Sequence, residues 1–326
     1  MRSFADAWNL MSALYNDLSE GEDHSDFFSD PPLLAHYTTT FVLEQIAKYN
    51  QIWFGNPLLM NDIEEVRFGI NEGLRTFLAS QIIRDSFASP ADAEHFERQL
   101  NAAYQNFDSN HAFDTYILCL CEHSRTDEDG LLSMWRGYGD SGKGVAVVFD
   151  PRGVLETPTS PLIIAKVRYA STDDRYGWFD KIAGEFAGII AQQRIEGSDE
   201  VAGSAWGLFA RLRQFALFTK HHGFSEEREW RLAYLPERDP DGGLKQFLGY
   251  HNGARGIEPK LKLPVAPNAA FGGQDISLER LVHSIILGPS ASSAIAVRSA
   301  QRMLELLNRP ILAQRVQGST IPYRNY

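Results

Sequence analysis

The chain has 326 residues, of which 44% are hydrophobic, so it can bury a substantial core in one large domain or two smaller ones. Its formal net charge of −11 opposes general binding to nucleic acid or anionic membranes, so a phosphate contact would need a local basic patch. The first residues lack a signal-peptide core, and no stretch approaches the roughly 20 apolar residues of a membrane-spanning helix, so we expect a cytoplasmic protein without a membrane partner.

The predicted elements fall into one domain over residues 1–326. Apolar residues at helical spacing predict an amphipathic helix within 1–20, and the acidic stretch after it predicts a polar connection over 21–32. The core then runs over 33–316. It contains no repeat and no low-complexity linker.

Helices and strands follow in irregular order within this core. Helices are predicted at 41–50, 62–86, 90–107, 177–195, 203–222 and 290–307. Strands are predicted at 33–40, 116–122, 144–150, 162–169, 229–234, 246–250, 281–287 and 311–316. Because strict βαβ alternation is missing, we expect an α+β fold with a mixed or antiparallel central sheet and helical insertions.

Cys119, Cys121 and His123 alternate along one predicted strand and so share a face. The outer two lie roughly 13 Å apart on a straight strand, whereas zinc ligands converge to about 2 Å from one ion. We therefore expect reduced core thiols and no metal site.

The glycine-rich segment GYGDSGKG at 137–144 matches the spacing of two nucleotide-binding fingerprints. Such loops follow a strand and open a helix, so that helix amides face phosphate. Here a helical turn comes first and a strand follows, and Gly144 stands where a magnesium-binding hydroxyl is needed. We expect a tight entry into a core strand instead.

Two glutamates stand close together in GFSEEREWRLAYLP at 223–236. If this segment is a strand, Glu227, Glu229 and Arg231 share a face, with the glutamate Cα atoms roughly 6.7 Å apart. Repulsion and partial burial raise a carboxyl pKa and a neighbouring arginine lowers it, which is how acid–base groups are tuned. The alternative is a charged solvent face, with Arg231 as an ion-pair partner and Trp230 turned into the core.

Five short motifs follow one another along the chain. They are His36-Tyr37-Thr38, Asn61-Asp62 with Glu65, Trp135 with Tyr138 and GKGVAVVFD, Glu227 with Glu229, Trp230 and Arg231, and IILGP at 285–289. In this order they resemble the bacterial domain of unknown function 2971 family, over roughly residues 33–310. Phe224 departs from this pattern, which favours a larger aromatic residue there.

The order of these motifs more loosely resembles the ADP-ribosyltransferase superfamily. The resemblance implies that His36, with Tyr37 and Thr38 beside it, holds a ribose of NAD, and that Trp135 or Tyr138 packs on nicotinamide. It implies that Glu229 grips the ribose 2′-hydroxyl and that Glu227 activates the acceptor. Arg231 is expected as an ion-pair partner of the glutamates, a role that leaves a contact with the dinucleotide phosphates open. The Ser-Thr-Ser signature of one branch is absent; only Ser133 lies near that place.

Three function classes follow from these residues. The first is an enzyme that uses NAD as its substrate, either transferring ADP-ribose to protein or nucleic acid or hydrolysing NAD. The second is a glycoside or nucleoside hydrolase that uses the same carboxylates. The third is a non-catalytic nucleotide-sensing or protein-interaction module, in which His36, Trp135 and Tyr138 serve the core and the glutamates form an ion-pair ladder.

Overall fold

The computed structural model describes residues 3–11, 14, 30–60, 63–152, 154, 160–253 and 256–323, although the side chains of 63–65, 110, 111 and 269 are not described. The chain divides into two compact units, each discontinuous in sequence. Unit 1 comprises Met1–His24, Pro57–Asp114 and Val167–Phe224, and unit 2 comprises Ser25–Asn56, Thr115–Lys166 and Ser225–Tyr326. Among the described residues, no helix is long and apolar enough to cross a membrane.

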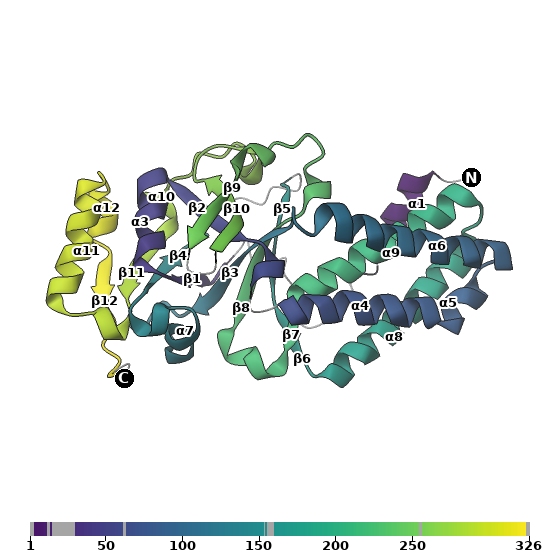
Figure 1. The fold of residues 1–326 in the computed structure, drawn as a ribbon, viewed down its shortest axis with the longest axis horizontal. Helices are drawn as coiled ribbons and strands as arrows, with labels where there is room; N and C mark the ends of the chain where they lie inside the picture. The colour runs from purple at the N-terminus through teal and green to yellow at the C-terminus, as the bar shows by residue number, and fades with distance from the viewer. Residues whose placement is uncertain are drawn as a thin grey trace. The chain divides into compact units, whose positions relative to one another are not determined.

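Unit 2 is built on a ten-stranded sheet that branches at β3 (Tyr116–His123) (Figure 1). The main path runs β12-β11-β4-β1-β3-β2-β10-β9, while β8 (Glu229–Tyr234) pairs with β3 and with β5 (Leu162–Lys166). Only β11 and β12 are parallel neighbours in the described sheet, so an α+β fold with a mixed, mostly antiparallel sheet is confirmed. The other strands are β1 (Leu33–Thr38), β2 (Gln51–Gly55), β4 (Val145–Phe149), β9 (Leu248–Gly253), β10 (Gly256–Pro264), β11 (Val282–Leu287) and β12 (Val316–Gly318).

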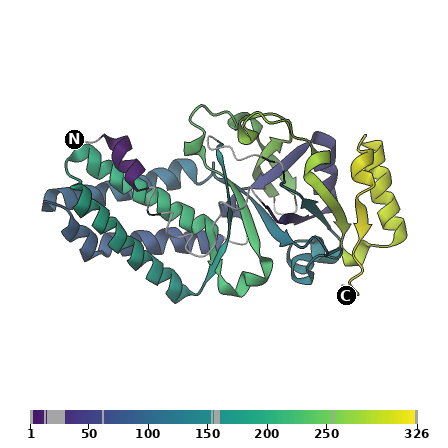
Figure 2. The same ribbon diagram turned by 180° about the vertical axis from the view of Figure 1, so that it is seen from behind.

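Alternation along the strands gives this sheet two different faces. One face carries the larger apolar cluster, and α3 (Thr40–Tyr49), α10 (Leu278–Leu281), α11 (Ala294–Leu306) and α12 (Pro310–Ala313) contribute Leu43, Leu278, Leu304 and Leu312 to it. Figure 2 shows the C-terminal helices, in yellow, beside the last strand. The other face carries a smaller cluster in which α7 (Leu132–Gly137) packs through Met134 and Trp135.

Unit 1 is mainly helical, with α9 (Ser198–Phe218) at its centre (Figure 1). Most of the α9 side chains are buried, and Phe215 stacks on Trp178 with ring centroids 3.7 Å apart. A two-stranded parallel ribbon of β6 (Arg168–Ala170) and β7 (Thr219–His221) completes the unit. The helices around α9 are α1 (Phe4–Leu10), α4 (Ile63–Ala79), α5 (Gln81–Ser86), α6 (Pro90–Asn106) and α8 (Thr172–Gln193).

Several predicted boundaries change in the structure. The helix expected over 62–86 is two helices, because Ser80 caps a second helix that begins at Gln81. The Ser80 hydroxyl accepts the Ile83 N–H. The helix predicted over 203–222 ends earlier, because α9 stops at Phe218 and Lys220 lies in β7. The run 311–316 begins as helix α12, and β10 was not predicted.

Three predicted features lie wholly or partly outside the described residues. The N-terminal helix is described as α1 only, and the polar connection only from residue 30 onward. Asn61, Asp62 and the side chain of Glu65 are also outside the described set.

Candidate functional site

The clearest functional candidate is an ion pair on β8. Glu229 and Arg231 lie two residues apart, opposite Cys121 and Cys119 of β3, and therefore share the face of the smaller cluster. Arg231 donates from Nε to Glu229 Oε1 at 2.8 Å and from Nη2 to Oε2 at 3.1 Å. Glu229 is buried and Arg231 is 0% exposed, so this two-contact pair is held away from bulk water.

Glu227 reaches the same region from a different element. It closes a 3-10 helix at His222–Glu227, and Arg228 after it has φ 41°, so the chain bends before β8 begins at Glu229. The Arg228 carbonyl accepts the Glu122 N–H at 3.0 Å, which ties the bend to β3. The two glutamates are therefore not alternate residues of one straight strand. Nothing in the sequence indicates the left-handed backbone conformation of Arg228, because residues other than glycine seldom adopt it.

Tyr138 supplies the partner of Glu227. It follows α7 directly, its side chain is 36% exposed, and its hydroxyl donates to Glu227 Oε1 at 3.0 Å. The two residues are 89 positions apart in sequence, and the packing of unit 2 brings them together. The two carboxylates thus have different environments: a phenol contacts Glu227, and a guanidinium contacts Glu229.

The glycine segment after Tyr138 positions α7 and needs no nucleotide. Its turn carries positive φ at Asp140, Ser141 and Gly142, and β4 follows. A Cβ at Gly144 would lie 2.2 Å from the Thr38 carbonyl oxygen, so only glycine fits beside β1 there. Thr38 itself ends β1 opposite Val145.

Tyr37 and Trp135 lie inside the smaller cluster. Their rings meet edge to face with centroids 4.8 Å apart, and both side chains are buried. The Trp135 Nε1 donates to the Asp129 carbonyl at 2.9 Å, and the Leu131 N–H donates to the Tyr37 hydroxyl at 2.9 Å. Burial raises the pKa of Tyr37 well above its usual range. These contacts give both rings a packing role that supports α7.

His36 lies where β1 leaves β3. The last residue of β1 that pairs with β3 is Ala35, opposite Cys121, and the next residue, His36, places Nδ1 3.1 Å from the Cys119 carbonyl oxygen. Because a carbonyl only accepts, Nδ1 carries the proton. The alternation of β1 groups His36 with Leu34, on the set that faces the larger cluster. Glu229 and Arg231 share the face of the smaller cluster, so His36 lies on the opposite face of the sheet, and the structure does not bring it together with them.

Electrostatics distinguish His36 from the thiol nearest the glutamates. Burial lowers the pKa of His36, and the Lys260 ammonium lowers it further, while the hydrogen bond to Cys119 opposes both. Burial raises the pKa of Cys121 to about 12, with Glu227 and Glu229 adding to the rise and Arg228 opposing it. Cys121 is therefore a protonated neighbour of the carboxylates and a poor nucleophile. It was predicted only as a core thiol.

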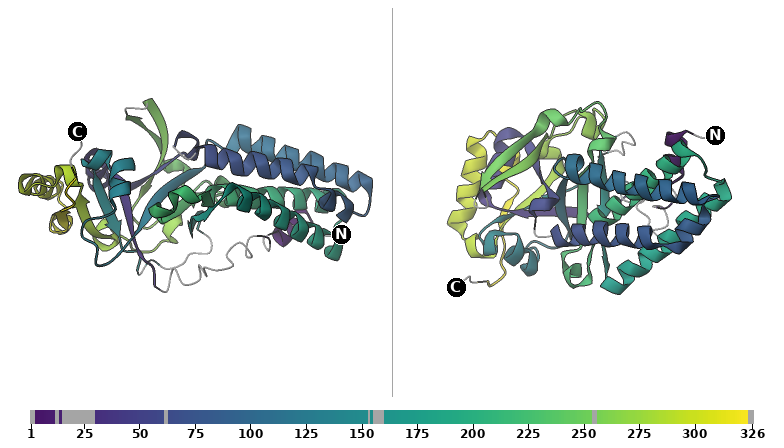
Figure 3. Two further views of the ribbon diagram at one scale, coloured as in Figure 1. Left: turned by 90° about the horizontal axis from the view of Figure 1, so that it is seen from below. Right: turned by 45° about the vertical axis from the view of Figure 1, so that its right-hand side comes forward.

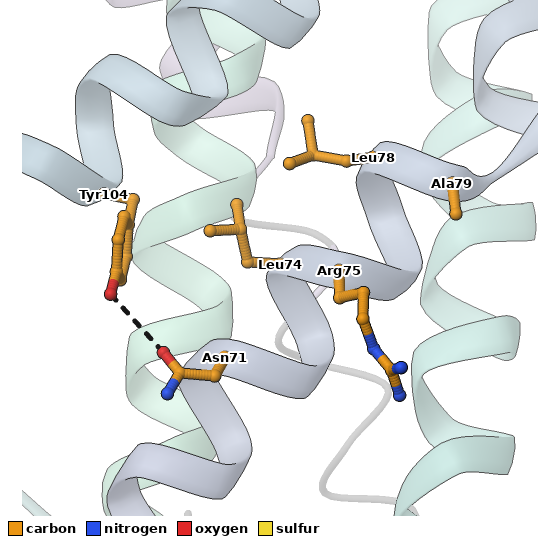
Figure 4. A pocket seen from close by; sticks show the side chains of 6 residues that line it. All are labelled: Asn71, Leu74, Arg75, Leu78, Ala79 and Tyr104. Atoms are coloured by element: carbon orange, nitrogen blue, oxygen red, sulfur yellow. Dashed lines mark hydrogen bonds between the residues drawn. The ribbon is translucent and has the colours of Figure 1, made fainter.

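Unit 1 offers a hollow of about 460 Å³ with little chemistry (Figure 4). Its polar contact is a hydrogen bond of 3.5 Å from the Tyr104 hydroxyl to Asn71 Oδ1, and Leu74 and Leu78 line the rest. Arg75 extends away from that bond in Figure 4 and pairs with Glu72. Across the described residues of both units, no three His, Cys, Asp or Glu side chains converge as a metal site.

Two carboxylates, a phenol and a guanidinium can support acid–base and charge-stabilising chemistry in unit 2. No curated protein and no solved structure matches this chain. A family model does match part of it, over residues 134–232. The segment that carries Trp135, Tyr138, Glu227, Glu229 and Arg231 is therefore similar to the family described as a protein of unknown function (DUF2971).

Proposed function

We propose that unit 2 cleaves the bond between nicotinamide and ribose in NAD, either transferring ADP-ribose to an acceptor or hydrolysing NAD with water. One observation carries the proposal. Two buried carboxylates, Glu227 and Glu229, reach one region of the unit and have different hydrogen-bond partners. Reactions of this kind need carboxylates in separate roles, and different partners are how proteins separate such roles.

Glu229 is the charge-stabilising group in this proposal. Loss of nicotinamide develops positive charge on the ribose, and a carboxylate fixed beside the ring stabilises that charge without reorganising during the reaction. The two contacts from Arg231 hold the Glu229 carboxylate in one orientation. The same pair would also serve a purely structural ladder, so activity has to decide between them.

Glu227 is the general base in this proposal, and Tyr138 positions it. The Tyr138 hydroxyl fixes the Glu227 carboxylate, which then takes a proton from an acceptor hydroxyl, amine or water. Because the Tyr138 ring is partly exposed, its face can pack on the cationic nicotinamide. Trp135 and Tyr37 support α7 from the core and are not assigned a substrate contact.

The test is release of nicotinamide from NAD, measured by chromatography. Glu227→Gln keeps an acceptor for the Tyr138 hydroxyl but removes the base, so we expect the rate to fall by about 10²- to 10⁴-fold while the melting temperature is nearly kept. Glu122→Gln is the matched control, because Glu122 lies on β3 but pairs with Lys166 at 3.7 Å. It should leave the rate unchanged.

Three results would separate the alternatives. Absence of nicotinamide release by the wild-type protein, with and without protein or nucleic-acid acceptors, would reject the proposal. Cleavage of nucleosides or glycosides that depends on Glu227, with NAD left intact, would assign a hydrolase instead. If Glu229→Gln lowers the stability and the wild-type protein turns over no substrate, the glutamates and Arg231 form a structural ion-pair ladder.

A further inference from the structure

A second group of side chains in unit 2 lies away from the glutamates, on β2, β9 and β10. We call Phe41, Trp53, His251 and Lys262 the ring row. His251 lies between the other two rings, with its centroid 5.5 Å from Phe41 and 5.5 Å from Trp53. The Lys262 Nζ lies 4.5 Å from the Trp53 centroid. The row therefore combines side chains from β2, β9, β10 and the first turn of α3.

Strand register explains why these side chains meet. Trp53 is opposite Lys262 in the β2–β10 ladder, and His251 is opposite Glu258 in the β10–β9 ladder. Trp53, His251 and Lys262 therefore share one face. Figure 3, left, shows the β9–β10 hairpin, in yellow-green, projecting from the unit-2 sheet.

Glycines leave the sheet bare around the row. A Cβ at Gly253 would lie 2.7 Å from His251 Nε2, and one at Gly249 would lie 3.5 Å from the Lys262 Cδ. Both glycines share the His251 face, two residues on either side of it. The strand thus gives His251 and Lys262 room to lie close to the sheet, and Phe41 remains 47% exposed at the end of the row.

The polar groups of the row are unused by the described part of the protein. The Trp53 Nε1 is buried and has no hydrogen-bond partner among the described residues, and no hydrogen bond or ion pair joins His251 or Lys262 to one of them. Lys260 on the same strand differs, because its Nζ pairs with Glu258 at 3.0 Å. The Lys262 ammonium over the Trp53 indole, beside the His251 imidazole and the partly exposed Phe41 ring, forms a positively charged surface on which a planar ring can stack.

We propose that the ring row binds a purine nucleotide, with the base stacked on the rings and the phosphate at Lys262. Base stacking on aromatic side chains and contacts from cations to phosphate are the two interactions by which proteins hold nucleotides without reading their sequence. A local cation is needed because the whole chain carries a net charge of −11. The proposal is independent of the NAD chemistry assigned to the glutamates.

The test is titration calorimetry with adenosine 5′-monophosphate and with a short single-stranded oligoadenylate. Trp53→Ala removes a stacking ring and should weaken binding of either probe by about 5- to 150-fold. Lys262→Gln should weaken binding and lower the salt dependence by roughly one phosphate contact. Tyr250→Ala is the control. Tyr250 lies on β9 next to His251 and is 66% exposed, but it is opposite Pro259 and its side chain is on the other face of the strand.

The two probes identify the source of the nucleotide. Binding of the monophosphate assigns a free nucleotide, and binding of the oligoadenylate alone assigns a single strand. Absence of binding to both probes overturns the proposal, as does equal affinity of the folded Trp53→Ala and wild-type proteins. The titration does not measure nicotinamide release, so a failure of the NAD proposal would leave this result unaffected.

Discussion

The two units bury positive charge in different ways. In unit 2 the guanidinium of Arg231 is paired with the carboxylate of Glu229, two residues away on the same strand. In unit 1 the cations lie over aromatic rings: Arg175 is 4.2 Å from the centroid of Phe68, and Lys220 is 4.7 Å from that of Phe224. Arg213 lies 5.7 Å from the Phe107 centroid.

This difference bears on the chemistry proposed for unit 2. A ring face attracts a cation but cannot accept a proton or fix a reacting group, so the unit-1 cations are part of the packing of a helical bundle. A buried carboxylate costs desolvation free energy and stays in place only with partners. Among the described residues, unit 2 buries the carboxylates of Glu227, Glu229, Asp239 and Glu258, and unit 1 buries that of Glu200.

The largest expected effect comes from breaking the buried pair. Arg231→Met leaves Glu229 buried without its cation, so the free energy of unfolding should fall by about 3–5 kcal/mol. The unit-1 counterpart is Arg213→Met. Burial and the neighbouring Arg211 lower the pKa of Arg213 to about 10, so its charge is costly and the loss for Arg213→Met should be smaller than that for Arg231→Met. Denaturant unfolding of both variants measures the contrast, and equal losses would contradict it.

Helix packing in unit 1 gives the next largest effect. A Cβ at Gly69 in α4 would lie 2.7 Å from Ala216 Cβ and 2.9 Å from its Cα, so the two helices touch through backbone. Gly69→Ala should cost about 1–3 kcal/mol of unfolding free energy, although alanine favours helix. Gly184→Ala in α8 has open space and should instead stabilise by roughly 0.5–1 kcal/mol. Stabilisation by both variants would show that the helices adjust.

Local patterns predicted many elements of both units. The strand 229–234 was predicted with the bounds of β8, and the helix 90–107 with the start of α6, which ends at Asn106, because alternation and a Ser89 cap are local signals. β10 was missed because Pro259 and alternate lysines obscure its apolar positions. Residues 219–222 were predicted as the end of the helix 203–222, but pairing with β6 makes 219–221 the strand β7.

The candidate site was harder to predict than the fold. The sequence indicated Glu227, Glu229 and Arg231 as a group, and the fork between Glu229 and Arg231 follows from their spacing. The bond from Tyr138 to Glu227 depends on packing across the unit, and the bend at Arg228 on one unusual dihedral angle. The ring row was not predicted, because its members come from segments that the linear pattern does not join.

A smaller effect tests the junction of β1 and β3. The native pKa of His36 is below its ordinary value of 6.5, so its protonated form is disfavoured in the folded state. The stability that this provides is present above pH 6.5 and is lost as the pH falls toward the native pKa. The wild type should therefore lose up to about 1.4 kcal/mol per pH unit more than His36→Asn below pH 6.5. Parallel pH profiles of unfolding for the two proteins would contradict this.

The smallest effect should come from the surface of unit 1. Arg84 Nη2 and Glu97 Oε1 are 2.6 Å apart, but their side chains are 51% and 33% exposed. Water and salt screen such a pair, so Glu97→Gln should cost only about 0.2–1 kcal/mol, and less at high ionic strength. Set beside Arg231→Met in the same unfolding assay, it separates the effect of burial from that of distance, since both pairs are close in space. Similar losses for the two variants would mean that Arg231 and Glu229 are far better hydrated than their burial indicates.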